Sequence, residues 1–172
     1  QLNKGADRDL SELMYSGRDR RFYTAIVYDK CSWIGETVEL NLGGNLSAGV
    51  RDKEDGGWYN TTTGYYWRKG NIENPTPRAY HNCQVALHFN IVRLGEAYMN
   101  LAEAYLLKHD VPNAVKALNM TRTIHGGLSE STAATEEEAW ADYIRERNCE
   151  LTNEGGDIYY SYLRWGKYGG YA

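Results

Sequence analysis

Residues 91–107, IVRLGEAYMNLAEAYLL, decide the fold that this sequence predicts. Apolar side chains recur in this stretch mainly at steps of three and four residues, the spacing that places them on one face of a helix. We therefore predict a helix from about Phe89 to Leu107. The residues predicted to form its buried stripe are Val92, Leu94, Tyr98, Leu101, Ala102 and Tyr105.

A second helix is predicted after a short polar stretch. Asp110 can cap this helix, and its first turn accommodates Pro112. The helix runs to about Thr123 and ends near Gly126-Gly127, because glycine readily adopts the left-handed conformation that closes a helix.

A third helix is predicted to begin at Thr135, because Thr135 and Glu138 have the spacing of a capping box. It should end before Gly155-Gly156. The residues predicted to form its buried stripe are Trp140, Tyr143, Ile144, the stem of Arg147, and Leu151. The aromatic tail, Ile158 to Tyr171, is predicted to pack over the helices as an irregular strap.

The first two helices have the spacing of one tetratricopeptide repeat. The pattern is Tyr98-x2-Leu101-Ala102-x2-Tyr105, followed by Ala114-x3-Leu118. The small alanines allow the two helices to approach each other closely, while Tyr and Leu side chains fill the remaining space. An isolated repeat cannot bury its outer faces, so we expect further units to come from a longer parent polypeptide.

The first half of the chain is predicted to hold short strands and long loops. Arg21–Lys30 is rich in β-branched and aromatic residues and indicates a largely buried strand, with short strands also at Thr37–Leu40 and Tyr65–Lys69. Asn41–Gly64 is dense in turn-forming residues and is predicted to be an exposed loop. The predicted fold is therefore mainly α: a tetratricopeptide-like helix pair plus a further helix, with a short β-hairpin and long loops.

Length and charge limit the possible functions. A chain of 172 residues suits one domain, which we divide into a strand and loop region, residues 1–80, and a helical region, residues 81–172. A net charge of -4 leaves no broad basic surface for nucleic acid. No stretch approaches the roughly 20 apolar residues of a membrane helix. The chain begins with Gln1 rather than Met, so we expect an upstream signal or anchor in a longer protein.

Cysteine and aromatic residues give further indications. Cys31, Cys83 and Cys149 are odd in number and widely spaced, which predicts buried thiols rather than a disulfide framework or a zinc site. The chain has 15 tyrosines and 5 tryptophans against 2 phenylalanines. Tyr and Trp combine an apolar face with a polar edge, which suits sugars, protein interfaces and wet clefts alike.

Five segments in a fixed order give the chain a family resemblance. They are RDRRF (18–22) leading to Trp33, GYYWRK (64–69), IVRLGEAYMNLAEA (91–104), ERNCELTNEG (146–155) and LRWGK (163–167). Together they resemble the C-terminal region of the SusD/RagB family, the surface glycan-binding lipoproteins of Bacteroidetes. In one departure, Gly156-Asp157 stands shortly after Glu154-Gly155, where the family usually has an arginine.

The resemblance implies a function and a location. It implies non-catalytic binding of a glycan or similar nutrient for delivery to a SusC-like TonB-dependent transporter in the outer membrane. It also implies a position at the cell surface, with a lipid anchor upstream of this chain. Family members are considerably longer, so we interpret the chain as a C-terminal part. The alternative is a helical-repeat protein-interaction module that does not itself contact sugar.

The candidate glycan-binding residues lie mostly in the predicted loop. Sugar binding requires an aromatic plate against the ring and planar polar side chains for its hydroxyls. The candidates are Trp58, Tyr59, Arg51, Asp55 and Asn60, with Trp33 at a predicted strand end as a further one. The loop aromatics could instead anchor the loop to the body, and a large aromatic at a strand end more often packs than binds.

We predict no enzyme activity, no cofactor and no metal. Glu96 and Glu103 share a helix face, but that helix otherwise serves packing, which makes glycoside hydrolysis there a poor interpretation. The four histidines lack metal-ligand spacing. A set of four charged residues is interpreted as ion pairs that join the third helix to the tail: Glu146, Arg147, Glu150 and Arg164.

Overall fold

The computed structural model describes residues 10–40, 44, 61, 63–71 and 90–166. The chain divides into two compact units. The first consists of Gln1–Arg18 and Tyr23–Cys83, and the second of Asp19–Phe22 and Gln84–Ala172. The short segment Asp19–Phe22 thus belongs to the second unit although it lies early in the chain.

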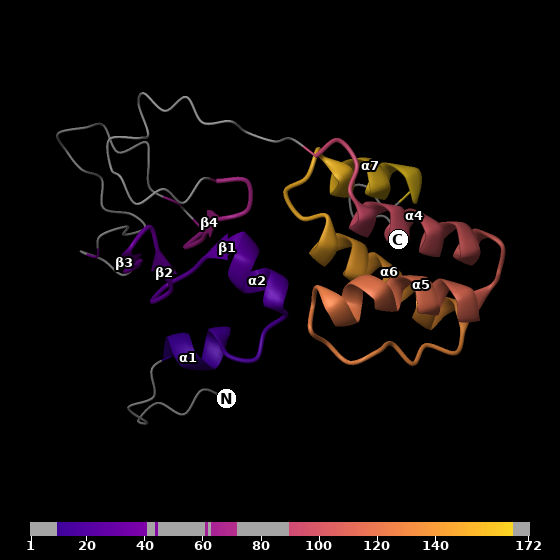
Figure 1. The fold of residues 1–172 in the computed structure, drawn as a ribbon, viewed down its shortest axis with the longest axis horizontal. Helices are drawn as coiled ribbons and strands as arrows, with labels where there is room; N and C mark the ends of the chain where they lie inside the picture. Colours follow the sequence, from indigo (N-terminus) through magenta and orange to yellow (C-terminus); the bar gives the residue numbers. More distant parts are fainter. Residues whose placement is uncertain (1–9, 41–43, 45–60, 62, 72–89, 167–172) are drawn as a thin grey trace. The chain divides into compact units, whose positions relative to one another are not determined.

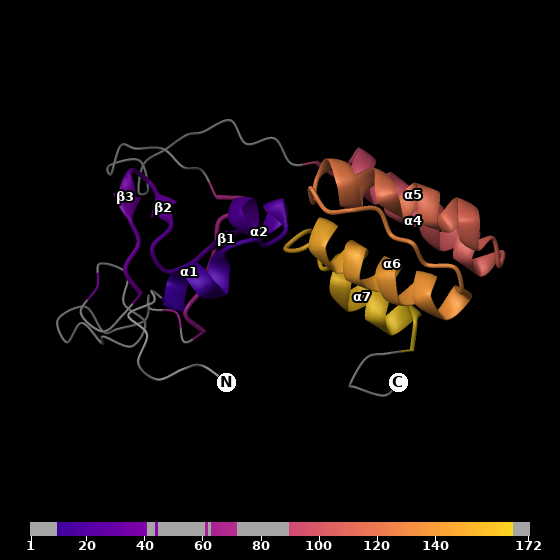
Figure 2. The ribbon, with the colours of Figure 1, turned by 90° about the horizontal axis from the view of Figure 1, so that it is seen from below.

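The second unit is built mainly from helices. They are α4 (Leu94–Leu107), α5 (Val111–Ile124), α6 (Glu136–Glu150) and α7 (Asp157–Arg164). A short turn joins α4 to the antiparallel α5, and α6 packs on one side of this pair so that each of the three contacts the other two (Figures 1 and 2). The predicted mainly α fold, with a helix pair and a further helix, is confirmed.

Capping residues fix the ends of α5 and α6 as predicted. The Asp110 side chain accepts a hydrogen bond from the backbone N–H of Asn113, and Pro112 occupies the first turn of α5. Thr135 and Glu138 form the reciprocal capping box at the start of α6. Each cap joins residues only a few positions apart, so the local sequence is enough to specify it.

The core of the second unit is made by α4, α5 and α6. Its buried members are Met99, Ala102, Leu106, Ala114, Ala117, Leu118, Ala139 and Tyr143. For α6 the predicted stripe is confirmed: Tyr143, Arg147 and Leu151 are buried, and the half-buried Trp140 and Ile144 pack against the core.

Half of the stripe predicted for α4 is confirmed, since Ala102 is buried, Tyr105 packs against the core and Tyr98 is half-buried. The other half and the predicted start of this helix are wrong. The helix begins at Leu94, and Val92, Leu94 and Leu101 are 65%, 70% and 44% exposed. The buried face instead contains the small Gly95, where an added Cβ would meet the carboxylate of Glu150. Since α4 has apolar residues on two faces, periodicity alone could not identify the buried one.

As far as residue 166 the tail packs on the other helices as predicted, through Trp165 and the Arg164–Glu103 ion pair. It forms a helix, however, and the prediction of an irregular strap is wrong. Gly155 and Gly156 adopt left-handed backbone angles and turn the chain after α6. Asp157 then lies in the first turn of α7, where its negative charge interacts favourably with the helix dipole.

The first unit has short elements (Figure 1). They are α1 (Leu10–Tyr15), α2 (Arg20–Ala25, whose first three residues belong to the second unit), β1 (Ile26–Val27), β2 (Ser32–Trp33), β3 (Glu36–Thr37) and β4 (Tyr66–Trp67). β1 pairs antiparallel with β4, and β2 with β3. Ile34 and Gly35 both have positive φ between β2 and β3, as tight hairpin turns require. The predicted β-hairpin is confirmed.

The strand predicted over Arg21–Lys30 is wrong in its first half, where α2 stands. Asp19 explains the difference, because its side chain accepts a hydrogen bond from the backbone N–H of Arg21 at 2.8 Å and its carbonyl one from Phe22 at 2.9 Å. This local cap starts a helix in spite of the β-forming composition.

A small core lies inside the first unit. It consists of Val27, Cys31, Val38 and Leu40, with Tyr28, Trp33 and Tyr66 packed against it. The thiol of Cys31 is buried as predicted, whereas Cys149 in the second unit is half-buried, and Cys83 lies outside the described residues. None of the helices in the described ranges combines the length and apolar character needed to cross a membrane.

Candidate ligand-binding site

Of the predicted glycan contacts, the structure describes Trp33. Trp58, Tyr59, Arg51, Asp55 and Asn60 lie outside the described residues. Trp33 is half-buried in β2 and packs against the core of the first unit. Its indole nitrogen is buried and has no hydrogen-bond partner within the described residues.

Strand β4 divides its aromatic residues between two faces. Tyr66 packs against the core of the first unit. Because side chains alternate along extended backbone, the neighbouring Tyr65 and Trp67 point to the opposite side, and they are 37% and 47% exposed. Neither residue is among the predicted glycan contacts, although the GYYWRK segment contains both.

Tyr65 joins a cluster of tyrosines from separate parts of the first unit. The Tyr15 ring stands edge-on to Tyr65, with the ring centroids 6.2 Å apart, and lies 4.6 Å from the ring of Tyr28. The Tyr23 hydroxyl donates to the carbonyl of Tyr15 at 2.5 Å. Burial, together with a hydrogen bond to Tyr65, raises the pKa of Tyr15, so its hydroxyl stays protonated.

Planar polar groups are held near these rings. Arg68 donates to the carbonyl of Tyr23 at 3.3 Å, and the Arg18 guanidinium donates to the carbonyl of Met14 at 2.8 Å. Aromatic faces beside fixed guanidinium groups can bind a polyhydroxylated ring. Within the residues that the structure describes, no group of three or more His, Cys, Asp or Glu side chains could hold a metal ion.

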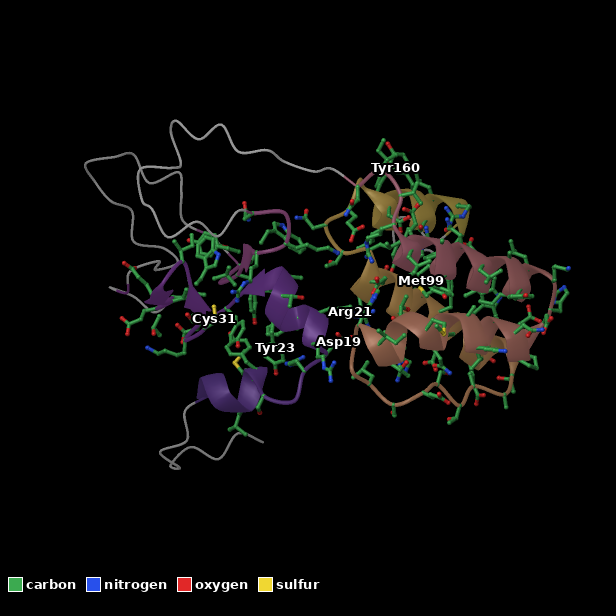
Figure 3. All side chains as sticks on the ribbon, in the orientation of Figure 1. Asp19, Arg21, Tyr23, Cys31, Met99 and Tyr160 are labelled. Carbon is green, nitrogen blue, oxygen red and sulfur yellow. The ribbon has the colours of Figure 1, made fainter. Side chains whose placement is uncertain are left out.

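The charged residues of the second unit form two separate clusters. The Glu150 cluster comprises Asp19, Arg21, Arg93, His125, Glu146, Glu150 and Glu154. Arg21 contacts Glu146 at 2.5 Å and Glu150 at 2.9 Å, and Arg93 also contacts Glu150. Asp19 holds Arg21 at 2.6 Å at the start of α2 (Figure 3). This cluster fastens the early segment to α6.

The Glu103 cluster comprises Glu103, Tyr143, Arg147, Asp157, Arg164 and Trp165. Glu103 accepts hydrogen bonds from the Tyr143 hydroxyl at 2.5 Å and from Arg164 at 2.7 Å. Arg147 binds Asp157 at 2.5 Å and so joins α6 to the start of α7.

The four residues predicted as one ion-pair set are therefore divided between two clusters. Arg147 does join α6 to the tail, as predicted. Glu146 and Glu150 instead bind Arg21, and Arg164 binds Glu103 of α4. These partners could not be predicted from residue spacing, because they lie far away along the chain.

Comparisons with known proteins identify relatives of this chain. The family model described as the SusD family matches residues 2–171. Among solved structures, the crystal structure of a SusD-like protein from Bacteroides fragilis NCTC 9343 has a TM-score of 0.72 and 29% sequence identity to this chain. The similarity covers 95% of this chain and 32% of the other, so this chain spans about a third of that protein's length. No curated protein matches.

Proposed function

This chain belongs to the SusD family, and on that premise we propose that it is the C-terminal part of a protein that binds a glycan or similar nutrient without catalysis. The observation that carries the proposal is the family match over residues 2–171. The bound nutrient would pass to a SusC-like TonB-dependent transporter in the outer membrane. A lipid anchor in the upstream part of the parent polypeptide would hold the protein at the cell surface.

We propose that sugar contacts are made by the first unit. The contacts proposed from the sequence are Trp58, Tyr59, Arg51, Asp55, Asn60 and Trp33. The exposed rings of Tyr65 and Trp67 are added to them. Support comes from the chemistry of these rings, since a Tyr or Trp face can stack on a pyranose while its polar edge remains hydrated.

The rest of the parent polypeptide is proposed as a partner of α4. Leu94, Ala97, Leu101 and Ala104 recur at steps of three and four residues and are all exposed. We call this row the outer stripe of α4. A second apolar face on a repeat helix is usual where another helix pair packs against it.

A glycan array with the whole parent protein tests the proposed function. We expect binding to at least one class of glycan and a loss of about tenfold on Trp58→Ala or Trp67→Ala, since each removes an aromatic face proposed to stack on the sugar. Tyr160→Ala is the matched control, because Tyr160 is a 62% exposed aromatic residue on α7. Turnover of chromogenic glycosides would contradict the non-catalytic part of the proposal.

The outer stripe of α4 favours one alternative function. Exposed Leu94 and Leu101 would also suit a helical-repeat module that binds another protein and never touches sugar. Blank glycan arrays with a correctly folded parent protein would favour this alternative.

A further inference from the structure

A pocket of about 640 Å³ lies in the second unit, and none of its lining residues is among those proposed above as sugar contacts. It is formed where α4 ends, near the start of α6 and at the end of α7. Its lining residues are Leu107, Glu137, Trp140, Ala141, Ile144, Arg164 and Trp165. A pocket of this size matches the usual range for small-molecule sites.

The two indoles of this pocket are held in place by the core. Trp140 and Trp165 each stand edge-on to the buried Tyr143, with ring centroids 5.6 and 5.8 Å from it. The Trp165 indole N–H also donates to Glu103 at 3.0 Å. Fixed side chains lose little conformational entropy when a ligand binds, so the indoles are pre-organised.

Three polar groups of the pocket retain binding capacity. Arg164 uses Nε and Nη2 for Glu103, while its Nη1 makes no hydrogen bond within the described residues. The exposed carboxylate of Glu137 and the indole N–H of Trp140 also lack partners among those residues. The pocket therefore offers two donors and one acceptor beside aromatic and aliphatic walls.

This combination selects the chemistry of a ligand. An anion would be opposed by Glu137 and a cation by Arg164, and a purely apolar ligand would desolvate both charges without replacing their hydrogen bonds. A neutral ring with an apolar face and several hydroxyls satisfies every group, because hydroxyls both donate and accept. We infer that this pocket binds a single pyranose ring, as a second sugar site in the helical unit.

The choice of a sugar among neutral polyhydroxylated compounds rests on the proposed function. The sugar ring would lie against the Trp140 indole, with its hydroxyls bonded to Glu137 and Arg164.

The test is calorimetric titration of the whole parent protein with methyl β-D-glucopyranoside, methyl β-D-galactopyranoside and methyl α-D-mannopyranoside. We expect at least one to bind, with affinity reduced about tenfold by Trp140→Ala and about threefold by Glu137→Gln. Trp140→Phe should retain most of the affinity, because it keeps a stacking ring and removes only the N–H. Tyr160→Ala and Glu130→Gln, which alter an exposed ring and an exposed carboxylate outside the pocket, should change nothing.

Several results would overturn the inference. One is binding of cyclohexanol with the same affinity as the pyranosides, which would show that the pocket is an apolar groove. Unchanged pyranoside binding by both Trp140→Ala and Glu137→Gln would place the sugar elsewhere and leave the proposed function intact. If no pyranoside binds the unchanged protein, the inferred pocket site is wrong. Glycan-array binding that is lost on Trp58→Ala would still support the sugar contacts proposed for the first unit. Thermal melting of each variant separates lost binding from lost folding.

Discussion

Glu150 and Glu103 are both buried carboxylates held by arginine, yet their surroundings differ. Glu150 contacts Arg21, Arg93 and His125, and the equally buried Glu146 beside it shares Arg21. Glu103 contacts Arg164 at 2.7 Å and Arg147 at 3.6 Å, but it also accepts hydrogen bonds from two neutral groups, the Tyr143 hydroxyl and the Trp165 indole. The Glu150 carboxylate is therefore held by arginine and histidine side chains, whereas the Glu103 carboxylate is shared between arginine and neutral donors.

The pKa values of both carboxylates follow from these contacts. Burial alone would raise the pKa of Glu150, but hydrogen bonds from Arg93, Arg21 and His125 outweigh it and the pKa lies below its usual value. Burial likewise opposes the charged form of Glu103, and hydrogen bonds from Arg164, Tyr143 and Trp165 lower its pKa. A buried carboxylate remains charged here only while its donors are present.

Removal of Arg21 should have the largest effect. Arg21→Met leaves Glu146 and Glu150 short of a shared cation, and breaking a buried ion pair costs about 3–5 kcal/mol. We expect this loss in the free energy of unfolding, measured by urea denaturation. Arg145→Met is the control, since Arg145 pairs with Asp142 at the surface and should cost at most about 1 kcal/mol. Equal losses would show that Arg21 stabilises the fold no more than a surface cation does.

The Glu103 cluster should be less sensitive to one lost group. Tyr143→Phe removes a hydroxyl that donates to Glu103 and accepts from Arg147 at 2.9 Å. The expected loss is about 1–3 kcal/mol, because Arg164 and Trp165 still satisfy the carboxylate. Tyr160→Phe, at an exposed position, should stay within about 0.5 kcal/mol. A loss as large as that of Arg21→Met would remove the distinction between the clusters.

Acidification should lower the stability that both clusters contribute, by less than the two substitutions above. Because the folded pKa of each carboxylate is lowered, its contribution to stability is present above the unfolded value of about 4.3 and is lost as pH falls through the folded value. Urea midpoints at pH 6 and pH 3 measure this loss. In Arg21→Met the pKa of Glu150 rises, so the variant should lose less between these pH values than the unchanged protein. A steeper loss in the variant would contradict this.

The smallest effect is expected at His125. Its ring nitrogen lies 2.8 Å from Glu150, but the side chain is 44% exposed and two arginines remain at that carboxylate. His125→Asn should therefore cost less than about 1 kcal/mol in the same denaturation experiment. A larger loss would make His125 an essential partner of Glu150.

The structure was predictable from the sequence where contacts between neighbouring residues determine it. The capping residues Asp110, Thr135 and Glu138 act within one turn, so the starts of α5 and α6 were predictable. The buried face of α4 was predicted only in part, because Leu94 and Leu101 form a second, exposed apolar row beside the buried one.

The candidate sites show the same limit. Tyr15 and Tyr65 meet across fifty positions, and Trp140 and Arg164 line one pocket from different helices. No spacing rule connects such residues, since tertiary packing alone brings them together. The Tyr-rich and Trp-rich composition did indicate aromatic contacts, but it could not locate them.

The assignment of Asp19–Phe22 to the second unit has a consequence for any attempt to treat the helices as a module. The helical unit is discontinuous in the chain, so a gene fragment that encodes residues 84–172 omits Arg21 and leaves Glu146 and Glu150 without it. Such a fragment could not be shuffled into another protein or expressed alone without loss. A separately supplied peptide that contains Arg21 should restore part of its stability, as in fragment complementation.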